Sequence, residues 1–251
     1  MSRLDFTLGP PLGHRANLGL IVLRTDETLE SEARRMLAGD GIAHYVTRVP
    51  CHSTVTLAGL AQMEAELPRS AALLPDEHPF DVVAYACTSG ATTIGPSRVD
   101  AGIRMGAVAT HTTNPLTACI AALRALNVSR MGFVTPYIAE VSQAMRGKLE
   151  EAGFHIAAFG SMEEENDIRV ARIDAASIAS AIRTVAADGD CEAIFLACTN
   201  LRALDVIVPL EAELGISVLT SNQVLLWHIL HLAGQPTCDL PYGALMQRGL
   251  A

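Results

Sequence analysis

The stretch Asp81-Val82-Val83-Ala84-Tyr85-Ala86-Cys87-Thr88-Ser89-Gly90 decides the fold. A short apolar run rich in β-branched residues is typical of a buried strand, and this one ends in a cysteine, two hydroxyl residues and a glycine. The pattern returns in Glu192-Ala193-Ile194-Phe195-Leu196-Ala197-Cys198-Thr199-Asn200. Both predicted strands deliver Ala-Cys-Thr at their carboxyl ends, and in open parallel sheets that edge is where ligands bind.

Two halves of the chain repeat the same order of elements. Each half runs strand, helix, strand, helix, strand and then Cys-Thr, with 68 residues from Gly19 to Cys87 and 66 from Gly132 to Cys198. Repeated βαβ units predict parallel sheets with right-handed crossovers. We therefore expect an α/β fold of two pseudo-symmetric parallel-sheet lobes, Rossmann-like or flavodoxin-like, with the active site in the cleft between them. Residues 1–113 plus 222–251 would form the first lobe and residues 114–221 the second.

Glycine, proline and capping residues divide the chain into elements. Residues 1–17 hold several glycines and prolines and are predicted to be an irregular arm. Predicted strands cover residues 19–23, 43–49, 80–86, 106–109, 131–135, 154–159, 192–197 and 217–219. Predicted helices cover residues 26–37, 56–67, 114–126, 136–151, 175–187, 205–214 and 222–232. The tail, 234–251, is expected to pack on the first lobe.

Composition excludes several classes of protein. Half of the 251 residues are hydrophobic and 18% are charged, which is typical of a globular protein. No apolar run approaches the roughly 18 residues of a membrane span. The formal net charge is −9 without a basic cluster, so nucleic acid and anionic membranes are poor partners.

The N-terminus and the cysteines indicate a reducing compartment. Residues 1–10 carry Arg3 and Asp5 but no apolar core, so they do not resemble a signal peptide, and we expect a cytoplasmic protein. The six cysteines form no CxxC pair and show no zinc spacing, so free thiols and no metal site are expected. His228 and His231 lie three residues apart but lack a third ligand, which favours packing roles.

Two facing thiols suit one kind of chemistry. A helix is expected to begin after each cysteine, and its amides lower a thiol pKa and hold an anion. One thiolate could remove a proton from carbon while the other thiol returns one to the opposite face. Alternatively, a thiolate could add to an activated double bond, and elimination after rotation would give the other geometric isomer. Thr88, Ser89, Thr199 and Asn200 are the available donors to an anionic substrate.

The paired Cys-Thr motifs on duplicated halves resemble the aspartate/glutamate racemase superfamily over nearly the whole chain. That superfamily includes amino-acid and hydantoin racemases, maleate cis-trans isomerases and arylmalonate decarboxylases. The segments Tyr85–Gly90 and Thr135-Pro136-Tyr137 look most like the maleate isomerase branch. The resemblance implies that Cys87 is the nucleophile and Cys198 the acid/base. It also implies that Tyr137 and Asn166 hold the substrate carboxylates.

One segment departs from the maleate isomerase pattern. Those enzymes place Pro-Ser-x-Asn after the first strand, whereas this chain has Leu23-Arg24-Thr25-Asp26. We expect Thr25 and Asp26 to contact the substrate, where an acid would repel a carboxylate and accept an ammonium or hydroxyl group. Amino-acid racemases of the superfamily carry aspartate there but have histidine where this chain has Asn200. The arm and this segment are similar to racemase-like proteins of ectoine and hydroxyectoine utilisation.

These patterns predict a cofactor-independent racemase or isomerase acting on a small amino- or hydroxy-substituted carboxylic acid. No GxGxxG or Walker pattern is present, so no nucleotide cofactor is expected. The expected partners are a small carboxylate and copies of the same chain in a dimer or tetramer, with neither nucleic acid nor membrane.

Other functions stay open. A maleate cis-trans isomerase is the first alternative. An arylmalonate-type decarboxylase needs only one thiol, so the second cysteine argues against it. A two-lobed solute-binding protein would have no use for matched thiols, and a non-catalytic ligand-binding relative is a further alternative.

Overall fold

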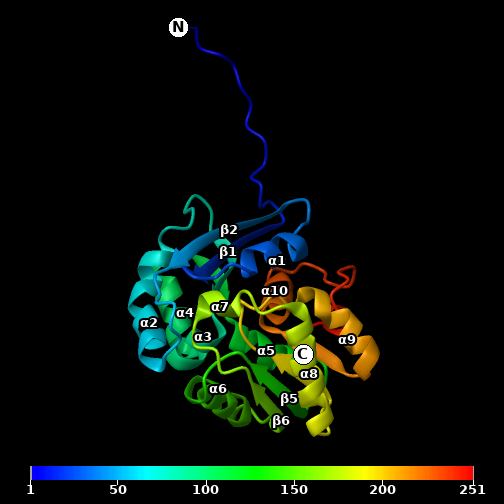
Figure 1. The fold of residues 1–251 in the computed structure, drawn as a ribbon. Helices are drawn as coiled ribbons and strands as arrows, with labels where there is room; N and C mark the ends of the chain where they lie inside the picture. Colours follow the sequence, from blue (N-terminus) through cyan, green and yellow to red (C-terminus); the bar gives the residue numbers. More distant parts are fainter. Residues whose placement is uncertain (1, 251) are drawn as a thin grey trace.

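The fold consists of two α/β lobes, which Figure 1 shows one above the other. A computed structural model describes residues 2–250. Each lobe has a four-stranded, wholly parallel sheet, with strand orders β2-β1-β3-β4 and β6-β5-β7-β8. The second order is the first with four added to each strand number. The predicted fold class, two similar parallel-sheet lobes, is confirmed.

The elements alternate regularly along the chain. The strands are β1 (Ala16–Leu23), β2 (Ile42–Val49), β3 (Phe80–Ala86), β4 (Ala109–Thr113), β5 (Arg130–Thr135), β6 (His155–Ser161), β7 (Ala193–Leu196) and β8 (Ser217–Thr220). The α-helices are α1 (Leu29–Met36), α2 (Leu57–Ala71), α3 (Thr88–Ile94), α4 (Pro96–Gly106), α5 (Pro115–Ala125), α6 (Ala139–Glu151), α7 (Asp167–Val170), α8 (Ala175–Asp188), α9 (Ile207–Leu214) and α10 (Ser221–Leu232). Two 3₁₀ helices are η1 (Leu204–Val206) and η2 (Ala244–Gln247).

Burial explains why the central strands are apolar throughout. Every residue of β7 and all but one residue of β1 and of β3 are buried, as expected for parallel strands covered by helices on both faces. Helix α10 packs against α5, α1, β3 and β4 as well as β8. All ten residues from Ser221 to Leu230 are buried, so this helix lies within the core that the two lobes share.

Several predicted boundaries are wrong. Strand β4 begins at Ala109, because Gly106 ends α4, where a Cβ atom would collide with the α2 backbone at Pro68. A helix is expected directly after Cys87, and α3 begins there, whereas α4 and α7 were not predicted. The β-branched sequence of α3 gives no helical period, although Pro96 stands at the favoured first position of α4.

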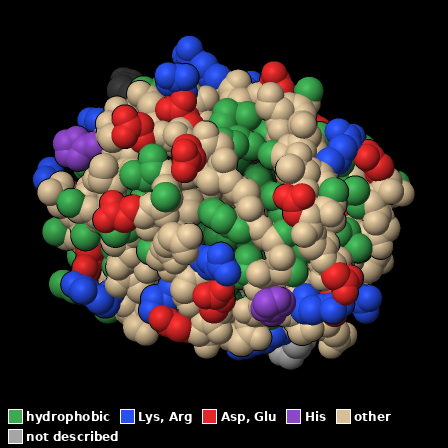
Figure 2. Space-filling view, turned by 60° about the horizontal axis from the view of Figure 1, so that its bottom comes forward, with side chains coloured by type: hydrophobic (Ala, Val, Ile, Leu, Met, Phe, Trp, Pro, Cys, Tyr) green, Lys and Arg blue, Asp and Glu red, His purple; other side chains and the backbone are tan. Residues whose placement is uncertain are grey.

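The two ends of the chain differ. Residues 2–10 form an irregular, exposed arm that extends away from the body in Figure 1. The C-terminal tail touches both lobes: Gln235 bonds to Arg15, while the backbone N–H of Ala244 donates to Glu211 of α9. Within residues 2–250 no helix is long and apolar enough to cross a membrane. On the face in Figure 2, acidic and basic side chains are interspersed.

A buried carboxylate joins the lobes at α1. One oxygen of Glu32 accepts hydrogen bonds from the backbone N–H groups of Ala203 and Leu204, at 3.2 and 3.1 Å. The other accepts from the side-chain amide of Asn222 at 2.8 Å. Burial nevertheless raises the pKa of Glu32 from 4.5 to about 7. The folded state therefore binds a proton here more tightly than the unfolded chain does.

This pKa shift predicts a specific dependence of stability on pH. The contribution of Glu32 is fully present below about pH 4.5 and is lost as pH rises through about 7. Since one pKa unit corresponds to about 1.4 kcal/mol, the loss is on the order of 3 kcal/mol. Glu32→Gln should flatten the decline in unfolding free energy between pH 5 and 8, measured by urea denaturation. The exposed Glu151→Gln is the matched control; equal slopes for wild type and Glu32→Gln would contradict this role.

Candidate active site

Cys87 occupies the turn between β3 and α3. It is the N-cap of α3, and its sulfur accepts a hydrogen bond from the backbone N–H of Gly90 at 3.2 Å. The Ser89 hydroxyl lies 3.6 Å from the same sulfur. A side chain at position 90 would collide with the Tyr85 hydroxyl and press on this sulfur, so glycine is required there. The motif Cys-Thr-Ser-Gly thus places the thiol at a helix N-terminus.

Cys198 is held differently. It follows β7 with a φ of 103°, in the left-handed region that non-glycine residues rarely adopt. Its backbone N–H donates to the Ser221 hydroxyl at 3.0 Å, and its sulfur accepts from the backbone N–H of Asn200 at 3.4 Å. The expectation of a helix directly after this cysteine is wrong, because a turn comes first and helical structure resumes at η1. The left-handed backbone of Cys198 is a strained conformation of a kind that costs about 1–3 kcal/mol and is typical of functional sites.

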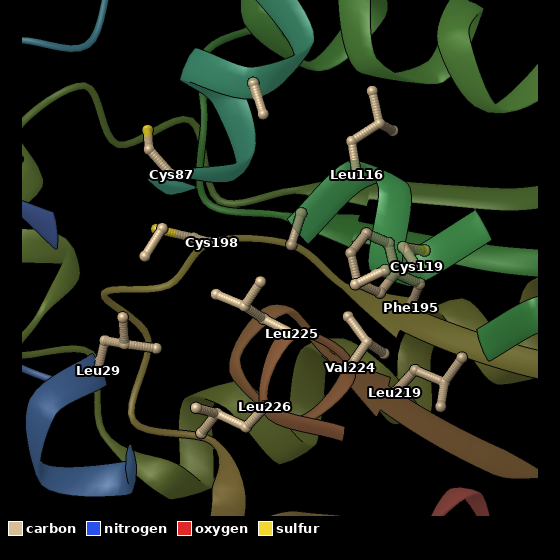
Figure 3. Packing of buried hydrophobic residues seen from close by; sticks show 14 of the residues in the cluster. Leu29, Cys87, Leu116, Cys119, Phe195, Cys198, Leu219, Val224, Leu225 and Leu226 are labelled. Carbon is tan, nitrogen blue, oxygen red and sulfur yellow. The ribbon is translucent and has the colours of Figure 1, made fainter. Parts of the chain in front are cut away.

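The two thiols face one small cavity between the lobes. Figure 3 shows the Cys87 and Cys198 side chains beside each other, one from the start of α3 and one from the loop after β7. The cavity measures about 20 Å³, room for about one water molecule. Its lining comes from both lobes: Leu23, Cys51, His52, Thr54, Val55, Gly59, Leu60, Met63, Cys87, Ser89, Tyr137, Asp167, Cys198 and Thr199.

Half of the ten predicted site residues line this cavity, namely Cys87, Ser89, Tyr137, Cys198 and Thr199. The Tyr137 side chain is buried, and burial raises the pKa of its phenol well above the usual 10. Tyr137 therefore stays a neutral hydrogen-bond donor. The carbonyl oxygen of Tyr137 is fixed by the hydroxyls of Ser142 and Ser161.

The other five predicted residues do not line the cavity: Thr25, Asp26, Thr88, Asn166 and Asn200. The Asp26 carboxylate caps the start of α1, accepting from the backbone N–H groups of Thr28 and Leu29 at 2.9 and 2.8 Å. Burial raises the pKa of Asp26 to about 6. The Asn166 side chain caps α7, accepting from the backbone N–H groups of Ile168 and Arg169 at 3.0 and 3.3 Å. Neither side chain is among those lining the cavity.

Thr88, Thr25 and Asn200 connect the site to its surroundings. The Thr88 hydroxyl donates to Ser221 at 2.8 Å, and Ser221 in turn accepts from the backbone of Cys198. This shared hydroxyl couples the two cysteine turns. The Thr25 hydroxyl donates to the Asp167 carboxylate rather than into the cavity. The side-chain amide of Asn200 donates to the backbone carbonyls of Thr25 and Asp167.

Sequence reasoning missed Asp167 and Ser221. Asp167 lines the cavity and is 3% exposed. It stands one residue after the predicted Asn166, so the loop was located but the residue facing the cavity was not. Ser221 follows Thr220, the N-cap of α10 in a capping box with Gln223, and that pattern could have marked the turn.

Two loops close the cavity across the lobes. The loop after β2 and the loop after β6 pair through Thr54 and Asn166 as an antiparallel bridge. The Val55 N–H donates to the Glu165 carbonyl at 2.8 Å, and the Asp167 N–H donates to the Ser53 carbonyl at 2.8 Å. The cavity has room for about one water, less than a four-carbon acid occupies, so a substrate of that size requires the cavity to widen.

The closed site keeps both thiols protonated. Burial raises the pKa of Cys87 to about 12, outweighing the Ser89 and Gly90 hydrogen bonds that lower it. Burial also raises the pKa of Cys198 well above 9, and the negative charge of Asp167 adds to this shift. Backbone amides do lower the thiol pKa values, that of Gly90 for Cys87 and that of Asn200 for Cys198, but burial outweighs them and the net shift is upward. All six cysteines are free thiols, as predicted.

Duplicated parallel sheets that each present a cysteine to one cavity define a member of the aspartate/glutamate racemase-like superfamily. Within it, the model of the arylmalonate decarboxylase family matches residues 19–246, and the chain belongs to that family.

The relatives include isomerases and a decarboxylase. A maleate isomerase of Nocardia farcinica is 26% identical over 244 residues, covering 93% of this chain and 96% of the relative. An arylmalonate decarboxylase of Bordetella bronchiseptica is 32% identical over 135 residues, covering 53% and 56%. Among solved structures, a Nocardia farcinica maleate cis-trans isomerase variant with a covalently bound succinylcysteine intermediate has a TM-score of 0.83 at 25% identity. It covers 92% of this chain and 98% of that one.

The closed cavity predicts the order in which the thiols react. Cys238 is exposed, whereas Cys87 and Cys198 are buried and protonated. Because alkylation requires an accessible thiolate, iodoacetamide at pH 7.5 should modify Cys238 at least roughly tenfold faster than either cavity thiol. Peptide mapping by mass spectrometry measures this order, with buried Cys119 as the slow reference. Fastest modification of Cys87 in the substrate-free protein would show that the cavity is open or its thiol ionised.

Proposed function

We propose that this chain is a cofactor-independent isomerase or racemase that acts on a small carboxylic acid through two cysteines. The observation that supports it is that Cys87 and Cys198, delivered by different lobes, line one closed cavity. Maleate isomerases among the relatives support the isomerase class. A buried single cysteine is commonly an inert core residue, but two at equivalent places in duplicated lobes are not explained by packing.

The mechanism needs one thiolate and one thiol. The thiolate takes the proton from the stereogenic carbon, and the electron pair moves into the adjoining carboxylate. The other thiol then gives its proton to the opposite face of that carbon, so the negative charge ends on the second sulfur. Hydroxyl groups of Ser89 and Tyr137 line the cavity and are the available donors to the enolate-like oxygens, whereas the Thr199 hydroxyl already donates to the Ala86 carbonyl.

Maleate cis-trans isomerisation is the second candidate, and the relatives favour it. One thiolate would add to the double bond while the other thiol protonates the neighbouring carbon. Rotation and reversal of both steps would release the other geometric isomer. Arylmalonate-type decarboxylation is less well supported, because it leaves one of the two cavity thiols without a role.

The proposed substrate is a small acid that carries an amino or hydroxyl group. Among the described residues that line the cavity, none is Lys or Arg, and one is an acid. Two substrate carboxylates would therefore meet no permanent counter-charge. Derivatives from hydroxyectoine breakdown are the first compounds to test. A cytoplasmic location and a homo-oligomer stay predictions.

Replacing either cavity thiol should abolish turnover. Cys87→Ser and Cys198→Ser each remove the proton donor or acceptor of one face, and proton-transfer groups typically contribute 10²–10⁴-fold. We expect turnover to fall at least roughly 10²-fold in each variant, measured by chiral chromatography of product. Exchange of the substrate proton with deuterated water should survive in one variant and so identify the base for that face.

Cys238→Ser is the matched control, because this cysteine is exposed and lies outside the cavity. It should retain wild-type turnover. Normal turnover by Cys87→Ser or by Cys198→Ser would rule out the two-thiol mechanism.

A substrate panel separates the two candidate functions. Thermal-shift screening of small amino, hydroxy and dicarboxylic acids should yield hits among the amino and hydroxy acids, whose stereochemistry is then followed by chiral analysis. Maleate should be turned over poorly, because placing a second substrate carboxylate beside the buried acid of the cavity wall costs on the order of 1–4 kcal/mol. Rapid conversion of maleate to fumarate, followed by absorbance, would instead place the activity among the maleate isomerases.

A further inference from the structure

We propose that Asp167 sets the substrate class of this site: its carboxylate accepts a hydrogen bond from an amino or hydroxyl group of a monocarboxylic substrate and disfavours dicarboxylates. The inference rests on the proposed function, because it concerns the acid that enters between the two thiols. It assigns to Asp167 the selectivity that the sequence had suggested for Asp26.

Asp167 is the acidic side chain of the cavity wall. It begins α7, is 3% exposed and shares the cavity with Cys87 and Cys198. The wall contains no Lys or Arg among the described residues, and its one histidine, His52, belongs to an exposed position of the loop after β2. A substrate group placed against Asp167 therefore meets a carboxyl group without a protein counter-charge.

The Asp167 carboxylate is held by a hydrogen bond from the first lobe. The Thr25 hydroxyl donates to Oδ2. The Asp167 backbone is fixed from both lobes, since its N–H donates to Ser53 at 2.8 Å and its carbonyl accepts from the Asn200 amide at 3.0 Å. A fixed acceptor discriminates strongly, because a substrate that lacks the donor leaves a buried polar group unpaired.

Asp167 also affects the chemistry of the sulfurs. Its negative charge is among the causes that raise the pKa of Cys87 and of Cys198. A cationic or hydrogen-bond-donating group of the substrate would screen that charge and make one thiolate easier to form. Substrate recognition and thiol activation would then share one residue. Asp26 lacks this position, because its carboxylate caps α1 and does not line the cavity.

The test compares four-carbon acids of matched size in wild type and Asp167→Asn. Isothermal titration calorimetry with 2-aminobutyrate, 2-hydroxybutyrate and maleate measures binding without turnover. Wild type should bind the amino or hydroxy acid more tightly than maleate. In Asp167→Asn the affinity ratio should shift toward maleate at least roughly tenfold, since an amide can donate to a carboxylate. Glu165→Gln, an exposed neighbour, should keep the wild-type ratio.

A second measurement uses no ligand. The pH midpoint for alkylation of Cys87 should fall in Asp167→Asn and in Asp167→Ser, because the charge that opposes the thiolate is gone. Unchanged affinity ratios, or failure of wild type to bind either substituted acid, would overturn the role of Asp167. Failure of the proposed two-thiol function gives a different result. In that case Cys87→Ser and Cys198→Ser would keep normal turnover, while the binding and alkylation effects of the Asp167 variants would still be observed.

Discussion

The structure depends on one buried amide, that of Asn200, which fixes the loop after β7 against the first lobe. Its oxygen accepts from the Glu27 N–H, and its nitrogen donates to the carbonyls of Thr25 and Asp167. Its own backbone carbonyl accepts from the Thr28 hydroxyl at 2.8 Å. Each such buried group, if left unpaired, costs about 1–3 kcal/mol. These hydrogen bonds together favour the one relative placement of the lobes that satisfies all of them, and in that placement the two sulfurs line the same cavity.

Other contacts between the lobes also pair a buried polar group of one lobe with a hydrogen-bonding group of the other. The Thr199 hydroxyl donates to the Ala86 carbonyl at the end of β3, and Glu32 accepts from the backbone near η1. The polar network surrounds a cavity whose far wall is apolar, including Leu60 and Met63. A reaction centre held in this way is organised before the substrate arrives, so little reorganisation is required during the reaction.

The sequence was most informative where one physical rule dominated. The apolar runs ending at Cys87 and Cys198 predicted parallel strands and located both thiols, because strand ends in such sheets share an edge. It was least informative where contacts between distant segments decide the outcome. Asn200 was predicted to contact the substrate, yet it connects the lobes. The choice of Asp167 over Asn166 as the cavity residue depends on a bridge to the loop after β2, which no local pattern encodes.

The two sulfurs come from duplicated halves but are not equivalent. Cys87 caps a helix in relaxed geometry, whereas Cys198 stands in a strained turn. For inversion of a stereocentre the overall equilibrium constant is one, so the ratio kcat/KM must be identical for the two mirror-image substrates. Unequal sulfurs leave kcat and KM free to differ separately. A fold with near-twofold symmetry can thus run a thermodynamically balanced reaction with each enantiomer held and released at its own rate.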